Sequence, residues 1–346
     1  MDSNTQYTRV GAVLLACFVA FLSWFFFASY VGHRGSAQVR EKNLTAHDDF
    51  LAIDGRHNGN KVAVGKFGMV FLTPDGGKTW QRRASGTQRA LSAVAFADQQ
   101  HGFIVGSGGV LLATVDGGKT WQAQNAGTKD QLLGIHAVTP LRAFAVGAFG
   151  TALSTSDGGR SWQKHELKWD ALIERIVKES GYVEPNLNAV YFSSLEVGWI
   201  VGEFGLVLHT KDGGQTWTSQ RYGNDLPQLY AVKFLDERRG WAVGQAGNII
   251  QTTDGGGHWS VVQVETRRDL YDFSIEEERG VIVGDGMILL SRDGGATWQS
   301  AGASPEDHWL AGVALKSSEA IAVGQAGTTR LLALDKLASE TGKKAP

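Results

Sequence analysis

The sequence predicts an all-β fold, a seven-bladed β-propeller preceded by one transmembrane helix, and three observations support that prediction. A turn-like motif recurs six times, a glycine motif recurs seven times in phase with it, and short strand-like runs lie between them. Glycine is 45 of 346 residues and proline only 6, while 42% of the residues are hydrophobic. This composition indicates many tight turns in a folded chain and excludes wholesale disorder.

Net charge and cysteine content exclude two further classes of protein. The formal net charge is −2, with 33 Lys and Arg against 35 Asp and Glu, which argues against a nucleic-acid-binding polycation. The single cysteine excludes a disulfide framework. It lies at Cys17, in the apolar N-terminal segment, so the rest of the chain has none, which suits an oxidising compartment.

The N-terminal segment 10–31 reads VGAVLLACFVAFLSWFFFASYV and carries no formal charge. It is long enough to cross about 30 Å of hydrocarbon as a helix. It also exceeds the apolar core of about 7–15 residues in a cleavable signal peptide. We therefore predict a tail over 1–9 and a retained single-pass anchor over 10–31, with a lipoprotein-like processing at Cys17 as the alternative. Basic residues flank both ends of the segment, so the positive-inside rule fixes its orientation poorly.

Two motifs recur with one shared period. Copies of T-x-D-G-G-x-T-W place aspartates at Asp75, Asp116, Asp157, Asp212, Asp254 and Asp293, spaced 41, 41, 55, 42 and 39 residues apart. The V-G-x-x-G motif, or a close variant of it, has its first glycines at Gly65, Gly106, Gly147, Gly202, Gly244, Gly284 and Gly324, spaced 41, 41, 55, 42, 40 and 40. One unit is therefore repeated seven times, and the seventh copy lacks the first motif.

Each unit contains four strand-like runs. In the second unit they are 91–96, 102–106, 109–115 and 120–124, all rich in β-branched or apolar residues and bounded by turns. Four strands in a unit of about 41 residues describe a propeller blade. Seven blades occupy 46–335 as one closed domain, followed by a tail over 336–346.

The last unit supplies only three strand-like runs. The stretch Ala37–Thr45, in the linker 32–45, precedes the first unit and has no other assignment. We expect it to close the ring as the outer strand of blade 7, which would leave the ring no unpaired edge.

The D-G-G-x-T-W motif resembles the Asp box, or bacterial neuraminidase repeat. We expect a hairpin turn between the third and fourth strands, in which the aspartate accepts hydrogen bonds from turn amides and the glycines take positive φ. The tryptophan would pack between blades. Six aspartates in identical turns cannot all be catalytic, so we predict a structural role, with calcium or sugar binding at individual boxes as the alternative.

The sequence does not indicate catalysis. Sialidases share the box, but their chemistry uses an arginine cluster, a tyrosine nucleophile and a carboxylic acid, and their F/Y-R-I/L-P motif is absent here. Tyr191, Tyr230 and Tyr271 lie on first strands, where we expect them to pack between blades. Histidines show no zinc-binding spacing. We predict no enzyme, no cofactor and no metal; a glycan-binding or sialidase-like glycoside hydrolase propeller is the alternative.

Partner binding is expected on one face of the ring. In a propeller the turns after the second strands share a face with the linkers between blades, and arginines and aromatics are typical interface anchors. The candidates on this face are Lys66, Phe67, Phe149 and Phe204 in the turns, and Arg82, Arg83, Arg89, Arg267 and Arg268 in the linkers. The alternative is scattered solvated arginines and phenylalanines that fill gaps between blades.

The spacing of 55 residues marks an insertion within 163–188. The segment 169–181, WDALIERIVKESG, has apolar residues at helical spacing, including Trp169, Ile173 and Ile176. We expect an amphipathic helix on the same face as the V-G-x-x-G turns. It would serve either as a docking element for a membrane partner or as a decoration packed on the propeller.

The full repeat, L-x-A-V-x-F followed by G-W-x-V-G-x-x-G and T-x-D-G-G-x-T-W, resembles the photosystem II assembly and stability factor propellers of cyanobacteria and plastids. The best matches are 187–217 and 229–259, and the resemblance covers about 46–335. It implies a non-enzymatic propeller on the far side of an energy-transducing membrane that holds unassembled subunits. It also implies an arginine patch, which we assign as a suggestion to Arg82, Arg83, Arg267 and Arg268.

The repeats, the apolar segment and the resemblance together predict a membrane-anchored scaffold for an integral membrane protein complex. Its place would be the bacterial inner membrane, with the propeller in the periplasm, or the equivalent arrangement in a thylakoid lumen. Because heterotrophic relatives are regarded as accessories to resistance-nodulation-division (RND) transporters, the complex is either photosystem-like or such a transporter. No nucleic acid and no small-molecule substrate are predicted.

Overall fold

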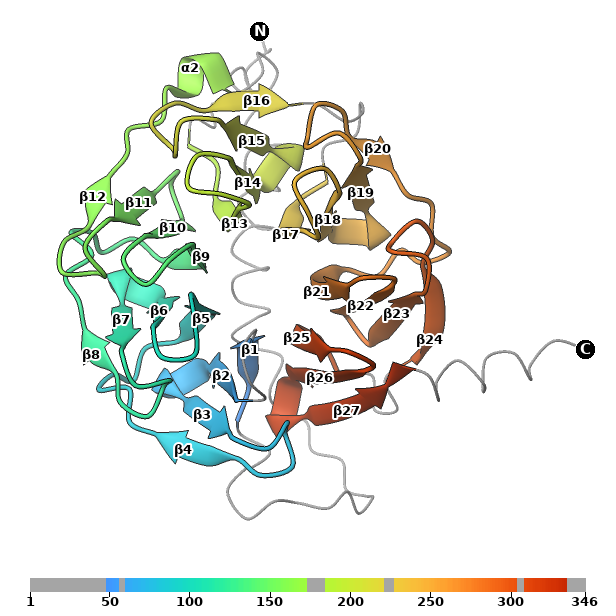
Figure 1. The fold of residues 1–346 in the computed structure, drawn as a ribbon, viewed down its shortest axis with the longest axis horizontal. Coiled ribbons are helices and arrows are strands. Elements are labelled where there is room, and N and C mark those ends of the chain that lie inside the picture. Colours follow the sequence, from blue (N-terminus) through green and yellow to red (C-terminus); the bar gives the residue numbers. More distant parts are fainter. Residues whose placement is uncertain (1–47, 56–59, 173–183, 221–226, 304–307, 335–346) are drawn as a thin grey trace, which may run out of the picture. The chain divides into compact units, whose positions relative to one another are not determined.

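The computed structural model describes residues 48–55, 60–172, 184–220, 227–303 and 308–334. These residues form seven antiparallel sheets that follow one another around a central axis (Figure 1). The inner strand of the first sheet contacts the inner strand of the last, so the ring closes. The predicted all-β, seven-bladed propeller is therefore confirmed.

Each blade is a meander whose strands pair with their neighbours in chain order. Blades 1 to 3 contain β1 (Phe50–Asp54), β2 (Lys61–Gly65), β3 (Val70–Thr73), β4 (Gln81–Arg83); β5 (Leu91–Phe96), β6 (Gly102–Gly106), β7 (Leu111–Thr114), β8 (Gln122–Ala123); β9 (Leu132–Ala137), β10 (Ala143–Gly147), β11 (Ala152–Thr155), β12 (Gln163–Lys164). A short helix, α2 (Trp169–Leu172), follows blade 3.

The remaining blades repeat the pattern. Blades 4 to 7 contain β13 (Leu187–Phe192), β14 (Gly198–Gly202), β15 (Val207–Thr210), β16 (Thr218–Gln220); β17 (Leu229–Phe234), β18 (Gly240–Gly244), β19 (Ile249–Thr252), β20 (Ser260–Val261); β21 (Leu270–Glu276), β22 (Arg279–Gly284), β23 (Met287–Ser291), β24 (Gln299–Ala303); β25 (Leu310–Lys316), β26 (Glu319–Gly324), β27 (Thr329–Ala333). Among the described residues, blade 7 has three strands, as the sequence predicts.

The core lies between the blades. The second strand of blades 1 to 5 is buried along its whole length, and its residues are mostly apolar or small. Such a strand is covered on both faces, which explains why its sequence is a continuous apolar run rather than an alternating one. Aromatic rings join neighbouring blades, as in the stack of Trp199 on Phe234 with ring centroids 3.7 Å apart.

The V-G-x-x-G turns follow the second strands and lie on one side of the ring, which we call the V-G face. This face is formed by the turns η1 (Lys66–Gly68), η2 (Ser107–Gly109), 148–150, η3 (Glu203–Gly205), η4 (Gln245–Gly247), 285–286 and η5 (Gln325–Gly327), together with the linkers between blades. In each turn, the amide after the first glycine donates to the carbonyl just before the inner strand of the same blade, as Gln245 does to Gln228 at 2.8 Å. The predicted common face of turns and linkers is thus present.

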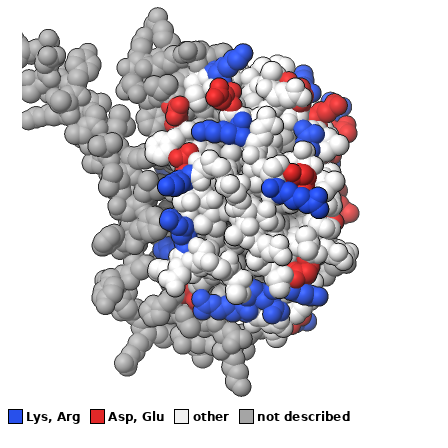
Figure 2. Space-filling view, turned by 90° about the vertical axis from the view of Figure 1, so that its left-hand side faces the viewer, with Lys and Arg blue, Asp and Glu red and all other residues white. Residues whose placement is uncertain are grey.

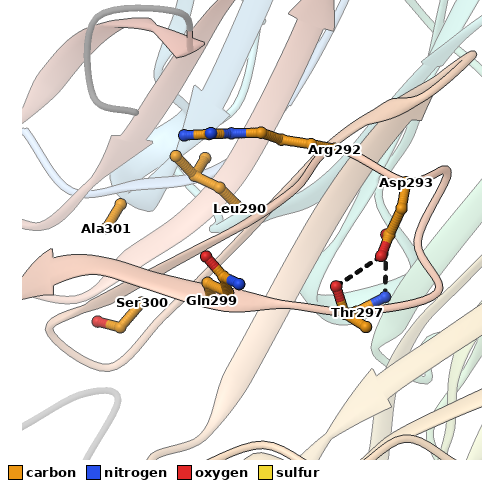
Figure 3. A pocket seen from close by; sticks show the side chains of 7 residues that line it. All are labelled: Leu290, Arg292, Asp293, Thr297, Gln299, Ser300 and Ala301. Atoms are coloured by element: carbon orange, nitrogen blue, oxygen red, sulfur yellow. Dashed lines mark hydrogen bonds between the residues drawn. The ribbon is translucent and has the colours of Figure 1, made fainter. Parts of the chain in front are cut away.

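The D-G-G turns join the third and fourth strands on the opposite side of the ring. In blade 6, Asp293 accepts hydrogen bonds from the amide and the hydroxyl of Thr297, at 2.9 and 2.6 Å (Figure 3). Ser291 donates to the same carboxylate at 2.8 Å. The aspartates of the other five turns make equivalent bonds, with His258 in place of the hydroxyl residue in blade 5. These turns are structural units built by the carboxylates.

The carboxylates of the D-G-G turns make the stability of the fold depend on pH in the acid range. Hydrogen bonds from Ser161 and Thr216 lower the pKa of Asp157 and Asp212 to about 2, from 3.8. A lowered pKa in the folded state contributes stability above the unfolded pKa, and this stability is lost as the pH falls through the folded pKa.

We expect the thermal unfolding midpoint to decrease as the pH is lowered from about 4 to about 2. The D157N/D212N variant should lose less over that interval in thermal melts. An unchanged pH dependence would contradict this assignment.

Side chains of the inner strands tie each blade to the next. Tyr191 donates to the carbonyl of Phe234 at 3.1 Å and stacks on His136, whose Nδ1 accepts from the amide of Phe192 at 2.7 Å. Asp54 accepts from the amide of Phe96 at 2.7 Å in the same way. The expectation that Tyr191 packs between blades is confirmed. Backbone polar groups at the inner edge of the ring therefore find hydrogen-bond partners in side chains of the preceding blade.

Several predicted segments lie outside the described residues: the tail 1–9, the anchor 10–31, the closing strand Ala37–Thr45, most of the helical insertion and the tail 336–346. Within the part of the chain that the structure describes, no helix is both long enough and apolar enough to span a membrane.

Candidate partner-binding face

Three phenylalanines are exposed on the V-G face. The side chains of Phe67, Phe149 and Phe204 are 68%, 61% and 38% exposed. Each comes two residues after the first glycine of its V-G-x-x-G motif. Exposed apolar side chains are meaningful as interaction surfaces when several of them gather on one face of a protein. The alternative that these rings fill gaps between blades does not describe Phe67 and Phe149.

The backbone at these phenylalanines is left-handed. Their φ values are 56°, 53° and 55°, in a region that bulky residues rarely occupy. A non-glycine residue in this conformation costs roughly 1–2 kcal/mol. Blades 5 and 7 have Ala246 and Ala326 at the same position with the same φ of 56°. The fold therefore tolerates a small residue there, and the aromatic rings are not required by the turn.

The phenylalanines lie on one part of the ring, and Arg89 accompanies them there. They come from blades 1, 3 and 4, and blades 1 to 4 follow one another around the left side of the ring in Figure 1. In blade 2 the equivalent residue is Gly108. A Cβ at Gly108 would lie 2.8 Å from Cζ of Arg89, so the Arg89 guanidinium occupies the space above this turn. We call Phe67, Arg89, Phe149 and Phe204 the aromatic arc.

Lys66 differs from its neighbour Phe67. It is only 9% exposed, and its ammonium donates to Asp49 at 2.8 Å in a buried ion pair. Its charge is therefore already matched within blade 1, at the start of the inner strand. Lys66 supports the turn that presents Phe67.

Arg82 and Arg83 lie in the outer strand β4, so their predicted place in a linker is wrong. The third-strand residues Phe71 and Val70 pair with them. The guanidinium of Arg82 lies 6.0 Å from the centroid of the Phe71 ring. Both arginines thus lie on the outer rim of blade 1.

Arg267 and Arg268 are exposed in the linker between blades 5 and 6. Arg268 donates to the carbonyl of Asp285 at 3.1 Å. The structure therefore places them on the V-G face, in a linker distant along the chain from the aromatic arc. The five candidate arginines do not form one group: two lie on the rim of blade 1, one lies in the arc and two lie at blade 6.

Asp269, beside Arg268, is not among the residues predicted from the sequence. Its carboxylate accepts from the amide of Ala246 at 2.9 Å and from the hydroxyl of Tyr230 at 3.4 Å. Burial and this carboxylate raise the pKa of Tyr230 above its usual range. The ring of Tyr271 lies 5.6 Å from that of Tyr230. The sequence contains a signal for this tyrosine pair, because Tyr230 and Tyr271 both occupy the second position of their inner strands.

The beginning of the insertion packs on the propeller. A Cβ at Gly150 would overlap the ring of Trp169, so this ring covers the V-G turn of blade 3. Leu172 is buried in the same apolar cluster as Phe144 and Phe192. Ile173 and Ile176 lie outside the described residues. Trp169 is thus next to the aromatic arc, on the turn that carries Phe149.

Charge alone does not mark a partner site on the flank of blades 2 and 3. Figure 2 shows this flank, where basic and acidic side chains are interspersed. A shallow hollow of about 250 Å³ lies instead at blade 6, between Leu290, Arg292 and the outer strand β24 (Figure 3). It contains the Asp293 turn, whose carboxylate is already hydrogen-bonded. Neither feature involves the exposed phenylalanines of the aromatic arc.

Comparison with known families gives one match. A family model described as "Photosynthesis system II assembly factor YCF48" matches residues 85–137, 123–229 and 227–306. These ranges together cover more than half of the chain. No curated protein matches the chain.

Several solved structures have the same fold. YCF48 bound to D1 peptide has a TM-score of 0.63 and 21% identity, over 84% of this chain and 93% of that one. YCF48 from Cyanidioschyzon merolae has a TM-score of 0.66 and 20% identity, over 86% and 99%. The GH74 enzyme of Niastella koreensis has a TM-score of 0.67 at 13% identity, over 84% of this chain and 53% of the enzyme.

Proposed function

Because this chain belongs to the family of the photosynthesis system II assembly factor YCF48, we propose that it is a non-enzymatic binding propeller that recognises a membrane protein. The aromatic arc on the V-G face is the observation that carries the proposal. Its phenylalanines are exposed, and Ala246 and Ala326 at the same turn position show that the fold needs no aromatic ring there. The D1 peptide bound to YCF48 supports the idea that a propeller of this fold recognises a segment of a membrane protein.

The partner in this proposal is an integral membrane protein complex whose assembly or operation the propeller assists. The segment 10–31 anchors the chain in the bacterial inner membrane, with the propeller on the periplasmic side or in a thylakoid lumen. The complex is either photosystem-like or an RND-type transporter. Aromatic and arginine side chains at the arc suit a partner segment that presents apolar side chains and a hydrogen-bond acceptor.

The experiment replaces the three phenylalanines by glycine in the full-length chain. Glycine adopts positive φ without strain, so the F67G/F149G/F204G variant should melt no lower than the wild type. Burial of one phenylalanine is worth about 1.5–3 kcal/mol, and a loss of about 1.4 kcal/mol is tenfold in affinity. We therefore expect the recovery of membrane partners by affinity purification from solubilised membranes to fall at least about tenfold.

A matched control changes the same turn position where no aromatic ring is present. The A246G/A326G variant makes the same backbone change in blades 5 and 7 and should retain full partner recovery. Unchanged recovery by the triple phenylalanine variant would overturn the proposal. Turnover of a polysaccharide substrate by the wild-type chain would favour the glycoside hydrolase alternative, which rests on the shared fold with the GH74 enzyme.

A further inference from the structure

Strand β27 is the outermost described strand of blade 7, whereas in the other six blades the third strand pairs with a fourth. Leu331 of β27 pairs with Ile321 and is 58% exposed. At the same register position, Leu72 of blade 1 is 5% exposed and Leu290 of blade 6 is 8% exposed. A strand that exposes its edge and a large apolar side chain is a site for strand addition.

Arg330 occupies a position that is apolar in every other blade. It pairs with Ala322 of β26, and the residues at the same register position are Phe71, Leu112, Leu153, Leu208, Ile250 and Leu289. Among the described residues, its Nη1 is buried with no hydrogen-bond partner. A buried guanidinium nitrogen without an acceptor is costly, so a missing neighbour should bring a carboxylate to this position.

The spacing of the other blades identifies that neighbour. In the five blades without an insertion before the next inner strand, the outer-strand residue paired with this position precedes that inner strand by 9 or 10 residues, as Arg82 precedes Leu91 and Ser219 precedes Leu229. Counting back from Phe50, the start of β1, reaches Glu41 for a spacing of 9 and Arg40 for a spacing of 10. Glu41 supplies a carboxylate, whereas Arg40 would place a like charge opposite Arg330.

The residues just before β1 lie where such a strand would deliver the chain. The amide of Gly327 in the blade 7 turn donates to the carbonyl of Asp48, and that of Ala326 donates to the carboxylate of Asp49 at 2.9 Å. The Ala246 amide of blade 5 holds Asp269 of the next linker in the same way. The chain therefore enters β1 across blade 7 as an ordinary linker between blades does.

We propose that the segment before β1 forms the outer strand of blade 7, in the register that places Glu41 opposite Arg330. The Glu41 carboxylate accepts hydrogen bonds from the Arg330 guanidinium, and the added strand covers Leu331. This assignment gives the closing strand expected from the sequence a register and names the ion pair that selects it.

Cysteine pairs test the register in the full-length chain, with Cys17 replaced by alanine. Directly opposed residues of antiparallel strands are close enough for a disulfide. We expect the E41C/R330C pair to form an intramolecular disulfide under mild oxidation, detected by peptide mass spectrometry, at several times the yield of R40C/R330C. Equal or better yield for R40C/R330C, or a disulfide between E340C and R330C, would overturn the proposal.

Charge exchange tests the ion pair itself. The single variants E41R and R330E should each lower the thermal midpoint by roughly 2–4 °C. The double variant E41R/R330E restores the pair with reversed charges and should regain at least half of the loss. A double variant as unstable as the two single losses combined would contradict the pair.

Discussion

Replacing Gly244 by alanine is expected to lower the free energy of unfolding by at least about 3 kcal/mol, the upper end of the usual range for overpacking. The dihedral angles do not require glycine, since φ is −170° and ψ is −149°. The cause is proximity: a Cβ would overlap the carbonyl oxygen of Gln228 and lie 2.9 Å from Cα of Leu229. These are backbone atoms at the start of β17, so no side-chain rotation relieves the contact.

A second glycine separates proximity from backbone conformation. Gly127 has a φ of 70°, and no atom lies within 4 Å of the point that a Cβ would occupy there. G127A therefore carries only the conformational cost of roughly 1–2 kcal/mol. Thermal or urea unfolding of the two full-length variants gives the comparison. A loss for G244A no larger than that for G127A would show that the close approach is not limiting.

The turn glycines illustrate what the sequence could predict. The period, the four strands of a unit and the number of blades follow from local patterns that repeat, and repetition makes each weak pattern strong. The first glycine of each V-G-x-x-G turn could be found but not explained. Glycine is needed at this position because a Cβ would collide with the carbonyl just before the inner strand, as for Gly244 and Gln228. No local sequence pattern records this contact.

The sequence predicted a face and a set of candidate residues on it, but not which of these residues are accessible to a partner. Lys66 and Phe67 are adjacent in one turn, yet the first is buried against Asp49 and the second is exposed. The side-chain direction depends on a partner 17 residues away. The same limit applies to Arg89, whose place in the arc depends on Gly108 of its own blade lacking a side chain. Tertiary contacts of this kind decide which candidates are available.

Asp272 holds three blades together and is the second position at which a large effect is expected. Its carboxylate accepts from Lys233 of blade 5 at 2.6 Å and from the amide of Val313 of blade 7 at 3.0 Å. Lys233 also donates to the carbonyl of Phe273. The pair is mostly buried, with side-chain exposures of 32% for Lys233 and 17% for Asp272.

The D272A variant should lose about 2–3 kcal/mol of unfolding free energy, because it leaves the Lys233 ammonium without its counter-charge and the Val313 amide without its acceptor. D272N keeps an acceptor for Val313 and should lose less. K233M/D272N removes both charges and should recover most of the stability that D272A loses, since the cost comes from the unpaired charge. R239A breaks the exposed pair with Asp236, keeps the bonds that Asp236 accepts from the amides of residues 238 and 239, and should cost at most about 1 kcal/mol. Equal losses for D272A and R239A in denaturant unfolding would mean that the inner-strand pair does not couple the blades.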